Sequence, residues 1–292
     1  MPRASRPRAV RICRAVSLKA LLVGSSPLST CTSLSDSAAL HVANSLSLRD
    51  NFDYGDGRAV HANLGVNGID GTLINFPTRA MTGSMWDGSE MCWRHAPQHY
   101  GAIHFHEDDI YDFEWETDFT VDVPEGLRSG IYGIRLQQGE HNDTIPLFIC
   151  PPKGKRTARL CILVSTFTYT VYGNHARGDY GDDWADKTKA WHAYPWNPAE
   201  YPQYGRSTYN FHSDRSGICH ASYRRPLFNL RPGYLTFGWS TCSGLKHFQA
   251  DSHLTSWLEN QGYDFDVVTD KELDEEGVGL LAGYSAVTTG AH

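Results

Sequence analysis

The run Leu160-Cys161-Ile162-Leu163-Val164 decides the fold that this sequence predicts. Five apolar residues without interruption are typical of a parallel β-strand that is covered on both faces. Apolar side chains at helical spacing then predict a helix over residues 248–258. A second strand is predicted at residues 264–269, a short helix at 270–273 and a third strand at 285–289.

This order of strands and helices is that of an open α/β sheet, which we assign to residues 160–292. Asp251 or Ser252 is expected to be the N-cap of the first helix, with Gly262 as its C-cap. Asp270 is expected to cap the second helix. The arrangement resembles the flavodoxin-like core of glutamine-amidotransferase-type domains.

The predicted sheet is incomplete at its last strand. The sequence ends at His292, directly after that strand and before a crossover helix that would cover it. Because both faces of a parallel sheet need cover, the last strands are expected to expose apolar surface. Either a partner chain supplies the missing layer or the sequence is a fragment, and the fragment is the simpler explanation.

A different pattern precedes this domain and predicts antiparallel strands. Residues 118–123 (DFTVDV) alternate strictly between polar and apolar side chains, as a strand with one buried face does. Further strands are predicted at residues 131–136 and 143–150, with Gly- and Pro-containing turns. This spacing predicts an immunoglobulin-like β-sandwich over residues 59–150. With residues 151–159 as a linker, the chain is predicted to be an α+β multidomain protein.

An aromatic-rich insertion separates the first α/β strand from the first helix. Residues 167–239 hold 17 of the 35 aromatic residues, mixed with Gly, Pro, Asn and His. Loops of this length without clear periodicity are uncommon in compact domains and are often functional. The aromatic side chains either pack the insertion onto the sheet, line a small apolar pocket, or form a sugar-binding platform.

Composition and charge exclude several classes of protein. The net charge of −7 argues against nucleic acid or an anionic membrane surface as a partner. No apolar run reaches the ~18–20 residues that span a bilayer, and the seven cysteines contain no CxxC pair. Residues 1–58 are left unassigned. Lys19 interrupts the apolar part of a possible targeting segment, so we favour a disordered or wrongly assigned start of the chain. We therefore expect a cytoplasmic protein.

The densest cluster of polar side chains is the run HFHEDD at residues 104–109. His104 and His106 share a face if the preceding strand continues through them, and some metal sites use that spacing. The sequence shows no third ligand at metal-binding spacing nearby. A solvated acidic turn at the end of a strand is the favoured alternative.

Cys242 is a second candidate, because an amidotransferase-like fold would place a nucleophilic cysteine between a strand and a helix. His220 or His247 would be required as the base, and no clear apolar strand leads into Cys242. We therefore favour a structural role for this thiol.

A third candidate site is the carboxyl edge of the predicted sheet, where α/β domains bind ligands. Asp251 and His253 start the predicted helix, and His292 directly follows a strand, so all three are expected there. Two histidines that converge on one crevice could ligate a metal or move protons. A capping aspartate beside two ordinary polar residues is the alternative.

Many short motifs mark residues 60–292, whereas residues 1–50 contain none. They are INFPTRAMTG at 74–83, WDGS at 86–89, WRHAP at 93–97, YGAIHFH at 100–106, WETDF at 115–119, SGIY at 129–132, PPKG at 151–154, TFTY at 166–169, WLE at 257–259 and TGAH at 289–292. In this order, the motifs resemble the large (beta) subunit family of N,N-dimethylformamidase.

The resemblance implies an amidohydrolase that cleaves N-substituted formamides, such as N,N-dimethylformamide, to formate and an amine. It also implies a small partner subunit, a homo-oligomer, and a mononuclear iron held by two tyrosines and a glutamate. Such an ion would polarise the amide carbonyl and lower the pKa of bound water. Hard oxygen donors of this kind suit Fe(III).

The sequence departs from the family pattern at the expected iron ligands. One ligand tyrosine is expected just beyond His292 and the glutamate much further on. The other tyrosine is expected near residues 251–253, where His253 is the candidate metal ligand because imidazole can also bind iron. Catalytic residues stay unassigned, and the chain alone is expected to bind little iron and to be inactive. The alternatives are a carbohydrate-binding or structural β-sandwich protein and a non-catalytic subunit.

Overall fold

The computed structural model describes residues 77–110, 112–175, 181–239 and 241–290, together with the strands at 9–13, 60–61 and 71–72. His292 and most of the unassigned stretch 1–58 lie outside the described residues.

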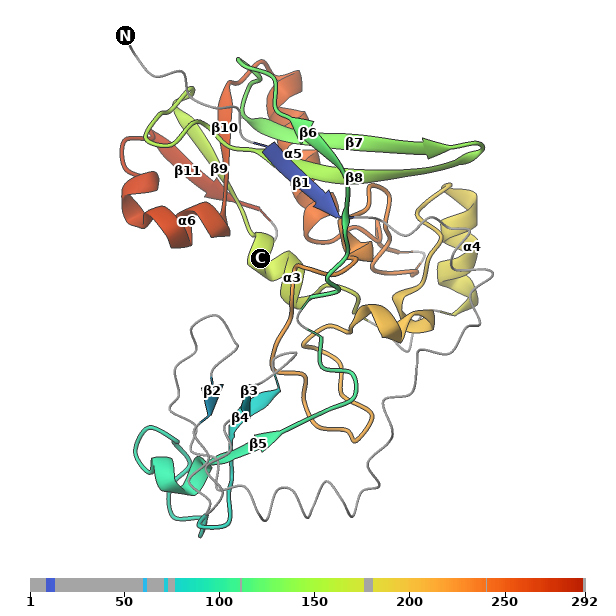
Figure 1. Cartoon of the computed structure of the whole chain (residues 1–292). Coiled ribbons are helices and arrows are strands. Elements are labelled where there is room, and N and C mark those ends of the chain that lie inside the picture. Colours follow the sequence, from blue (N-terminus) through green and yellow to red (C-terminus); the bar gives the residue numbers. More distant parts are fainter. Residues whose placement is uncertain are drawn as a thin grey trace.

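A three-stranded parallel sheet forms the centre of the α/β region (Figure 1). Its strands are β9 (Leu160–Val164), β10 (Phe265–Thr269) and β11 (Ala286–Thr289), in the order β10-β9-β11. Both outer strands run parallel to β9. The parallel sheet that the apolar run predicted is therefore confirmed.

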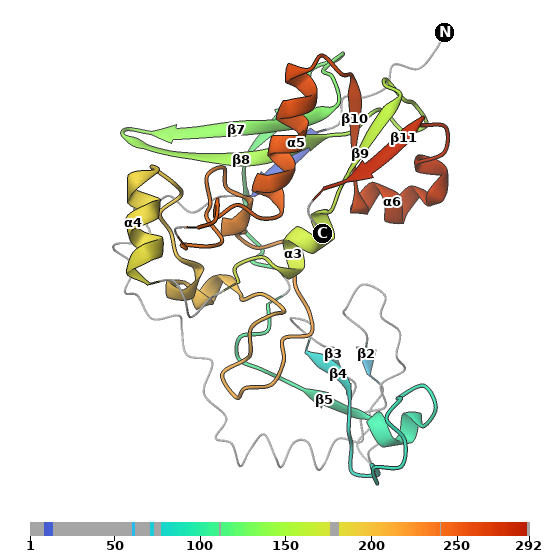
Figure 2. The ribbon, with the colours of Figure 1, turned by 180° about the vertical axis from the view of Figure 1, so that it is seen from behind.

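Three helices accompany this sheet. α3 (Thr166–Val171) follows β9, α5 (Phe248–Asn260) leads into β10, and α6 (Asp270–Glu276) connects β10 to β11 (Figure 2). The connection from β9 to β10 and the connection from β10 to β11, which crosses β9, run in opposite directions along the sheet. Because such connections are right-handed, α5 and α6 lie on opposite faces of the sheet.

The sheet and α5 share an apolar core. All five residues of β10 are buried. The buried members of the core are Ile162, Val164, Tyr169, Phe248, Leu258, Phe265 and Val267. Burying an aliphatic or aromatic side chain of this size stabilises the fold by about 1.5–3 kcal/mol. β11 adds little to this core, because Ala286, Val287 and Thr289 are exposed.

The start of α5 differs from the predicted N-cap. The helix begins at Phe248, so Asp251 and Ser252 lie within its first turns. Both side chains bond elsewhere, which is why neither caps the helix. The Asp251 carboxylate accepts a hydrogen bond from the Tyr169 hydroxyl, and Ser252 Oγ donates to the Gln249 carbonyl oxygen at 2.7 Å.

The other predicted helix ends are partly correct. Gly262 has a φ of 75° and lies one residue beyond Gln261, the C-cap of α5. The N-cap of α6 is Thr269 and not Asp270, because Thr269 Oγ1 accepts a hydrogen bond from the Lys271 N–H at 3.2 Å. α6 also continues beyond the predicted end at Leu273.

The predicted immunoglobulin-like sandwich over residues 59–150 is not confirmed. Within the described residues, the strands of this region form separate two-stranded antiparallel sheets. The longest pair is the hairpin of β7 (Gly130–Gln138) and β8 (His141–Ile149). Ile131 and Phe148 of this hairpin pack against the α/β core. The base of the hairpin therefore packs against the α/β core, whereas a sandwich would have packed the hairpin against a second antiparallel sheet.

β6 (Thr117–Asp122) shows why the alternating pattern misled the prediction. The strand forms as expected and pairs with β1 (Ala9–Cys13), which lies in the unassigned stretch. Its side chains are exposed except for Val121, which is half-buried. An alternating pattern sets which side chains share a face, but burial of that face needs a packing partner.

Two shorter antiparallel pairs and several 3₁₀ turns complete the described elements. β2 (Val60–His61) pairs with β3 (Gly71–Thr72), and β4 (Thr78–Met81) pairs with β5 (Ala102–His104). The 3₁₀ turns are η1 (Pro97–Tyr100), η2 (Pro198–Glu200), η3 (Pro202–Tyr204), η4 (Phe228–Leu230) and η5 (Val278–Leu280).

The predicted linker at residues 151–159 is tied to the sheet through a buried carboxylate. Asp266 of β10 is completely buried. One of its oxygens, Oδ2, accepts hydrogen bonds from the Thr157 N–H at 2.8 Å, the Ala158 N–H at 3.2 Å and the Tyr284 hydroxyl at 2.9 Å. Its other oxygen accepts from the Thr157 hydroxyl. The linker is therefore fixed where it enters β9.

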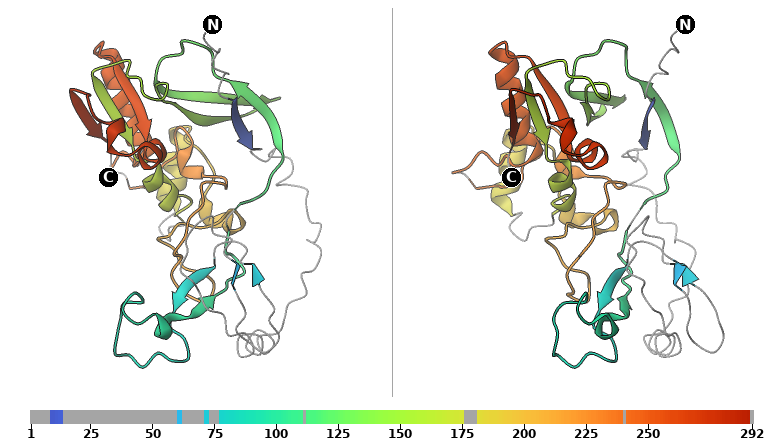
Figure 3. Two further views of the ribbon diagram at one scale, coloured as in Figure 1. Left: turned by 60° about the vertical axis from the view of Figure 1, so that its left-hand side comes forward. Right: turned by 90° about the vertical axis from the view of Figure 1, so that its left-hand side faces the viewer.

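The aromatic-rich insertion packs on itself and contains the helix α4 (Asp182–Ala190). Its aromatic cluster consists of Tyr204, Phe228 and Tyr234, with Tyr194, Trp196 and Tyr201 of the insertion and Phe113 and Trp115 of a preceding segment packed around them. These side chains have a packing role, as one interpretation expected, but they pack on one another and on that segment, whereas the interpretation placed them on the sheet. Part of the insertion lies beside the β4–β5 pair in both views of Figure 3.

None of the helices in the described part of the chain combines the length and the apolar character that a membrane crossing requires.

Candidate functional site

Tyr169 and Asp251 meet at the carboxyl edge of the parallel sheet. Tyr169 lies on α3, directly after β9, and Asp251 lies near the start of α5. The two side chains are 0% and 3% exposed, and the Tyr169 hydroxyl donates a hydrogen bond to Asp251 Oδ2. The prediction that Asp251 points into this edge of the sheet agrees with this geometry.

Gly290, which follows β11, packs against the same carboxylate. A Cβ atom at Gly290 would lie 1.9 Å from Asp251 Oδ1, so only glycine fits there. The segments that follow β9 and β11 therefore both contact Asp251. We call Tyr169, Asp251 and Gly290 the crevice group.

The protonation state of the crevice group follows from its burial. Burial raises the pKa of the Tyr169 hydroxyl far above its ordinary value, and the hydrogen bond to Asp251 raises it further. Tyr169 is therefore a neutral donor that holds one oxygen of Asp251 in place. The Tyr169 hydroxyl therefore positions the Asp251 carboxylate.

His247 borders the crevice group in an unusual backbone conformation. Its φ is 53°, a sparsely populated region for a residue other than glycine that costs on the order of 1–3 kcal/mol. The ring is buried and lies 4.4 Å from the Tyr172 ring, between centroids. The His247 carbonyl oxygen accepts the Asp251 N–H at 2.9 Å, which fixes the first turn of α5.

The structure separates His253 from Asp251. His253 is exposed on α5, and two residues correspond to about 200° around a helix, so its side chain leaves the opposite face from Asp251. His292 lies outside the described residues, so the predicted convergence of these two histidines stays a prediction. A role for His253 as a metal ligand likewise stays a prediction.

Cys242 gains no support as a nucleophile. It lies in a loop, and α5 begins only at Phe248. The Cys242 thiol donates to the Trp239 carbonyl oxygen, with 3.4 Å between sulfur and oxygen.

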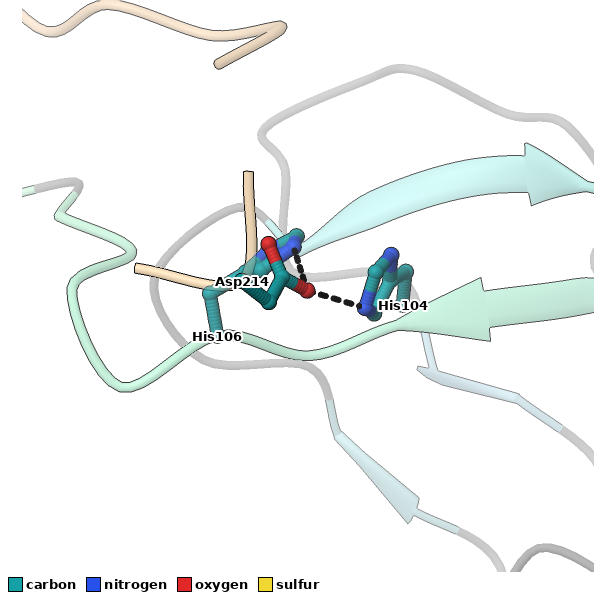
Figure 4. Close-up of side chains that lie close together, drawn as sticks. All are labelled: His104, His106 and Asp214. Atoms are coloured by element: carbon teal, nitrogen blue, oxygen red, sulfur yellow. Dashed lines mark ion pairs between the residues drawn. The ribbon is translucent and has the colours of Figure 1, made fainter. Parts of the chain in front are cut away.

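The structure also brings together a second group of polar side chains at the end of β5. His104 Nε2 and His106 Nε2 lie 3.0 Å and 3.6 Å from the same oxygen, Asp214 Oδ2 (Figure 4). The two imidazole centroids are 4.1 Å apart, so these histidines lie together. β5 ends at His104, however, and does not continue through His106, which was the condition under which the two were expected to share a face. Asp214 is the third group that the sequence did not show.

The far side of His106 faces a further carboxylate and a further histidine. His106 Nδ1 lies 3.4 Å from Asp109 Oδ1. The His212 ring stacks on His106 with centroids 3.6 Å apart, and His212 Nδ1 lies 2.5 Å from Asp108 Oδ1. Burial raises the pKa of Asp109, and the hydrogen bond that its carboxylate accepts from the backbone N–H of His106 lowers the pKa by less. The predicted solvated acidic turn is therefore a packed network of carboxylates and imidazoles.

The two segments of this network lie over one hundred positions apart in the sequence. Asp214 belongs to the run His212-Ser213-Asp214 of the insertion, and sequence reasoning missed it because nothing in local spacing connects that run to residues 104–109. A His-x-Asp run within the insertion was the available signal. Two hydrogen bonds from Ser216 lower the pKa of Asp214 to about 2, so its carboxylate is ionised.

Comparison with known proteins places both groups in a single family. A family model described as N,N-dimethylformamidase beta subunit-like, C-terminal, matches residues 78–292. The chain belongs to this family. The predicted resemblance to N,N-dimethylformamidase beta subunits is thereby confirmed, and the crevice group and the histidine cluster both lie within the matched residues.

Two curated relatives carry the same family name. The N,N-dimethylformamidase beta subunit of Paracoccus aminophilus is 41% identical over 234 residues, and that of Alcaligenes sp is 38% identical over 234 residues. Each match covers 77% of this chain and 30% of the relative. The chain therefore spans less than a third of the length of these N,N-dimethylformamidase subunits.

Proposed function

We propose that this chain contributes to an enzyme that hydrolyses N-substituted formamides, with N,N-dimethylformamide as the model substrate. Water adds to the formyl carbon, the C–N bond breaks, and formate and dimethylamine are released. The observation that carries the proposal is the 41% identity to an N,N-dimethylformamidase beta subunit. The small amide substrate, a small second subunit and a homo-oligomer are parts of the same proposal.

The crevice group supports this proposal as a positioned carboxylate at a sheet edge. Ligands of α/β proteins bind at that edge. Tyr169 holds one oxygen of Asp251, and Gly290 lies against the other. A carboxylate fixed in this way can orient groups that act on the amide, although Asp251 itself is buried.

The mononuclear iron that the resemblance implies does not fit the crevice group. Tyr169 offers a neutral hydroxyl that is bonded to Asp251, whereas an iron-binding tyrosine is deprotonated. The groups of histidines, cysteines and carboxylates that converge in the described part of the chain contain His and Asp only. We therefore assign no step to iron here, and iron ligation by His253 remains a proposal that needs ligands from elsewhere.

A chimera tests the proposed function. Residues 78–292 replace the matching segment of the Paracoccus aminophilus beta subunit, and formate release from N,N-dimethylformamide is measured with the second subunit present. We expect activity to be retained, because the segment supplies the same structural part. A chimera that folds and assembles but releases no formate would contradict the proposal.

The 292-residue chain alone should release no measurable formate. Amide hydrolysis needs the reacting groups held together at close range, and this chain covers only 30% of the relatives. The same assay, with the chimera as the positive control, measures this difference. Comparable turnover by the short chain would show that the whole active site lies within these residues.

A further inference from the structure

The histidine cluster at the end of β5 has the features of a metal site that is separate from the crevice group. We propose that His104, His106 and Asp214 bind a divalent transition-metal ion of the Zn²⁺ type. The site would join the β4–β5 pair to the insertion. This inference does not depend on the proposed hydrolysis of formamides.

The three donor atoms lie within 4.8 Å of one another, and the two separations that involve the carboxylate are close to the edges of a coordination polyhedron. Asp214 Oδ2 lies 3.0 Å from His104 Nε2 and 3.6 Å from His106 Nε2. In a tetrahedral zinc site with bonds of about 2.0–2.1 Å, neighbouring ligand atoms lie about 3.3–3.4 Å apart. Figure 4 shows both imidazoles directing a nitrogen at the same carboxylate oxygen. Small rotations of these side chains would centre an ion between them.

The carboxylate is already oriented without a metal. Asp214 Oδ1 accepts hydrogen bonds from the Ser216 N–H at 2.8 Å and from Ser216 Oγ at 2.6 Å. These bonds occupy one oxygen and leave Oδ2 facing the two histidines. Ser216 Oγ also lies 2.7 Å from His106 Nε2, and it would give up that contact when the nitrogen binds an ion.

The surroundings of His106 fit a metal-bound imidazole. Its side chain is only 4% exposed, and Nδ1 has no hydrogen-bond partner among the described residues. Binding through Nε2 requires the ring proton to sit on Nδ1, which lies 3.4 Å from Asp109 Oδ1. Metal-bound histidines usually donate their other N–H to a carboxylate, and a small shift of Asp109 would complete that hydrogen bond. The stacked ring of His212 holds the plane of His106.

The donor set and its exposure define the kind of ion. Two imidazoles and one carboxylate suit Zn²⁺, and three protein ligands leave one position for water. Mg²⁺ prefers six oxygen ligands, so it should bind poorly. The side chains of His104 and Asp214 are 39% and 44% exposed, so an ion can enter from solvent.

The alternative is a metal-free network in which Asp214 only accepts hydrogen bonds from the two imidazoles. Calorimetric titration of the chelator-treated 292-residue chain with Zn²⁺ distinguishes a metal site from this network. We expect one tightly bound Zn²⁺ per chain and no comparable binding of Mg²⁺. His104→Ala and Asp214→Asn should each weaken Zn²⁺ binding at least tenfold. Asp109→Asn keeps the three ligands and should weaken binding by about 10–100-fold.

His95→Ala is the matched control. His95 Nδ1 lies 3.1 Å from Glu90 Oε2, so it is also a histidine–carboxylate pair, and neither residue belongs to a group of three potential ligands in the described chain. Its replacement should leave Zn²⁺ affinity unchanged. Equal affinity in the His104, Asp214 and His95 variants would overturn the proposal, as would the absence of Zn²⁺ binding by the unaltered chain.

Two measurements on the unaltered chain avoid dependence on the folding of variants. Zn²⁺ should protect His104 from chemical modification, as measured by peptide mass mapping, and should leave His95 reactive. Co²⁺ in the same site should give a tetrahedral spectrum without thiolate charge-transfer bands. Thiolate bands would assign the ion to the cysteines, and failure to protect His104 would likewise overturn the proposal.

Discussion

At the scale of single residues, buried carboxylates organise the α/β region. Asp266 accepts hydrogen bonds from the linker and from Tyr284, and Asp251 accepts one from Tyr169. The position of Asp251 at the sheet edge was predictable, because the start of a helix there is recognisable in the sequence. The role of Asp266 was not predictable, because donors such as the Thr157 N–H come from a segment 109 positions away.

Asp266→Asn should lower the free energy of unfolding by about 3 kcal/mol. The amide can accept at only one of its two terminal atoms, so a buried donor loses its partner, and such losses are larger at charged groups. Urea denaturation measures the change. Asp264→Asn is the control, because Asp264 is exposed and its pair with Arg128 should contribute at most about 1 kcal/mol. Equal effects of the two substitutions would refute the role of Asp266.

Gly290→Ala should destabilise the chain by about 1–3 kcal/mol, because the added methyl group overlaps the Asp251 carboxylate. In the chimera, the same substitution should lower formate release by displacing Asp251. The control is Gly279→Ala, since a Cβ at Gly279 meets no atom within 4 Å. Thermal unfolding and the formate assay measure the two effects. A chimera with normal activity after Gly290→Ala would remove Asp251 from the proposed site.

At the scale of elements, uninterrupted runs of apolar residues and alternating polar and apolar residues differ in what they predict. The uninterrupted apolar run at β9 predicted a parallel strand correctly, because strands covered on both faces are typically apolar. β10 is also fully buried, although it contains Asp266. Alternation predicted β6, and apolar runs between turns predicted β7 and β8, but neither pattern predicted the partners of these strands. The β7–β8 hairpin packs on the parallel sheet through Ile131 and Phe148. The β10 strand that the hairpin contacts lies more than one hundred residues further along the sequence. A pattern in the local sequence therefore could not predict this contact.

Ser129 fixes this hairpin to the sheet and provides a test at the scale of elements. Ser129 Oγ accepts the Val267 N–H at 2.7 Å and donates to the Ile149 carbonyl oxygen at 2.8 Å. Ser129→Ala leaves a buried N–H without its acceptor and should cost about 1–3 kcal/mol. Ser256→Ala, at an exposed position of α5, should change stability by no more than about 0.5 kcal/mol. Hydrogen exchange of β7 and β8 should increase only in the Ser129 variant.

At the scale of the whole molecule, the described chain is an α/β core with an attached hairpin and a linked insertion. The fold class of its second half and the family were predictable from the sequence. Two of the three proposed metal ligands, His104 and His106, were recognisable as a candidate pair, because they stand two positions apart in one polar run. Asp214 was not, because only the folded insertion brings it to that strand.

The outer strand β11 should promote self-association of the isolated chain. Val287 is 40% exposed on this strand, and an uncovered strand can pair with another chain. Val287→Lys should therefore reduce the fraction of dimers and larger species in sedimentation velocity. Val278→Lys alters a more exposed valine in a 3₁₀ turn and should have little effect. If the two variants associate to the same extent, β11 is not the surface responsible.

The contact between His212 and Asp108 joins positions that are 104 residues apart. This separation affects the order in which contacts form during synthesis of the chain. At roughly 5–20 residues per second, a ribosome needs roughly 5–20 s to synthesise the intervening chain. The β4–β5 pair must spend that interval without the segment that completes its histidine cluster. Closing so large a loop is also entropically costly, since each doubling of loop length adds about 0.6 kcal/mol. The newly made chain should therefore acquire the contacts of residues 212–216 late, after the local β7–β8 hairpin has formed.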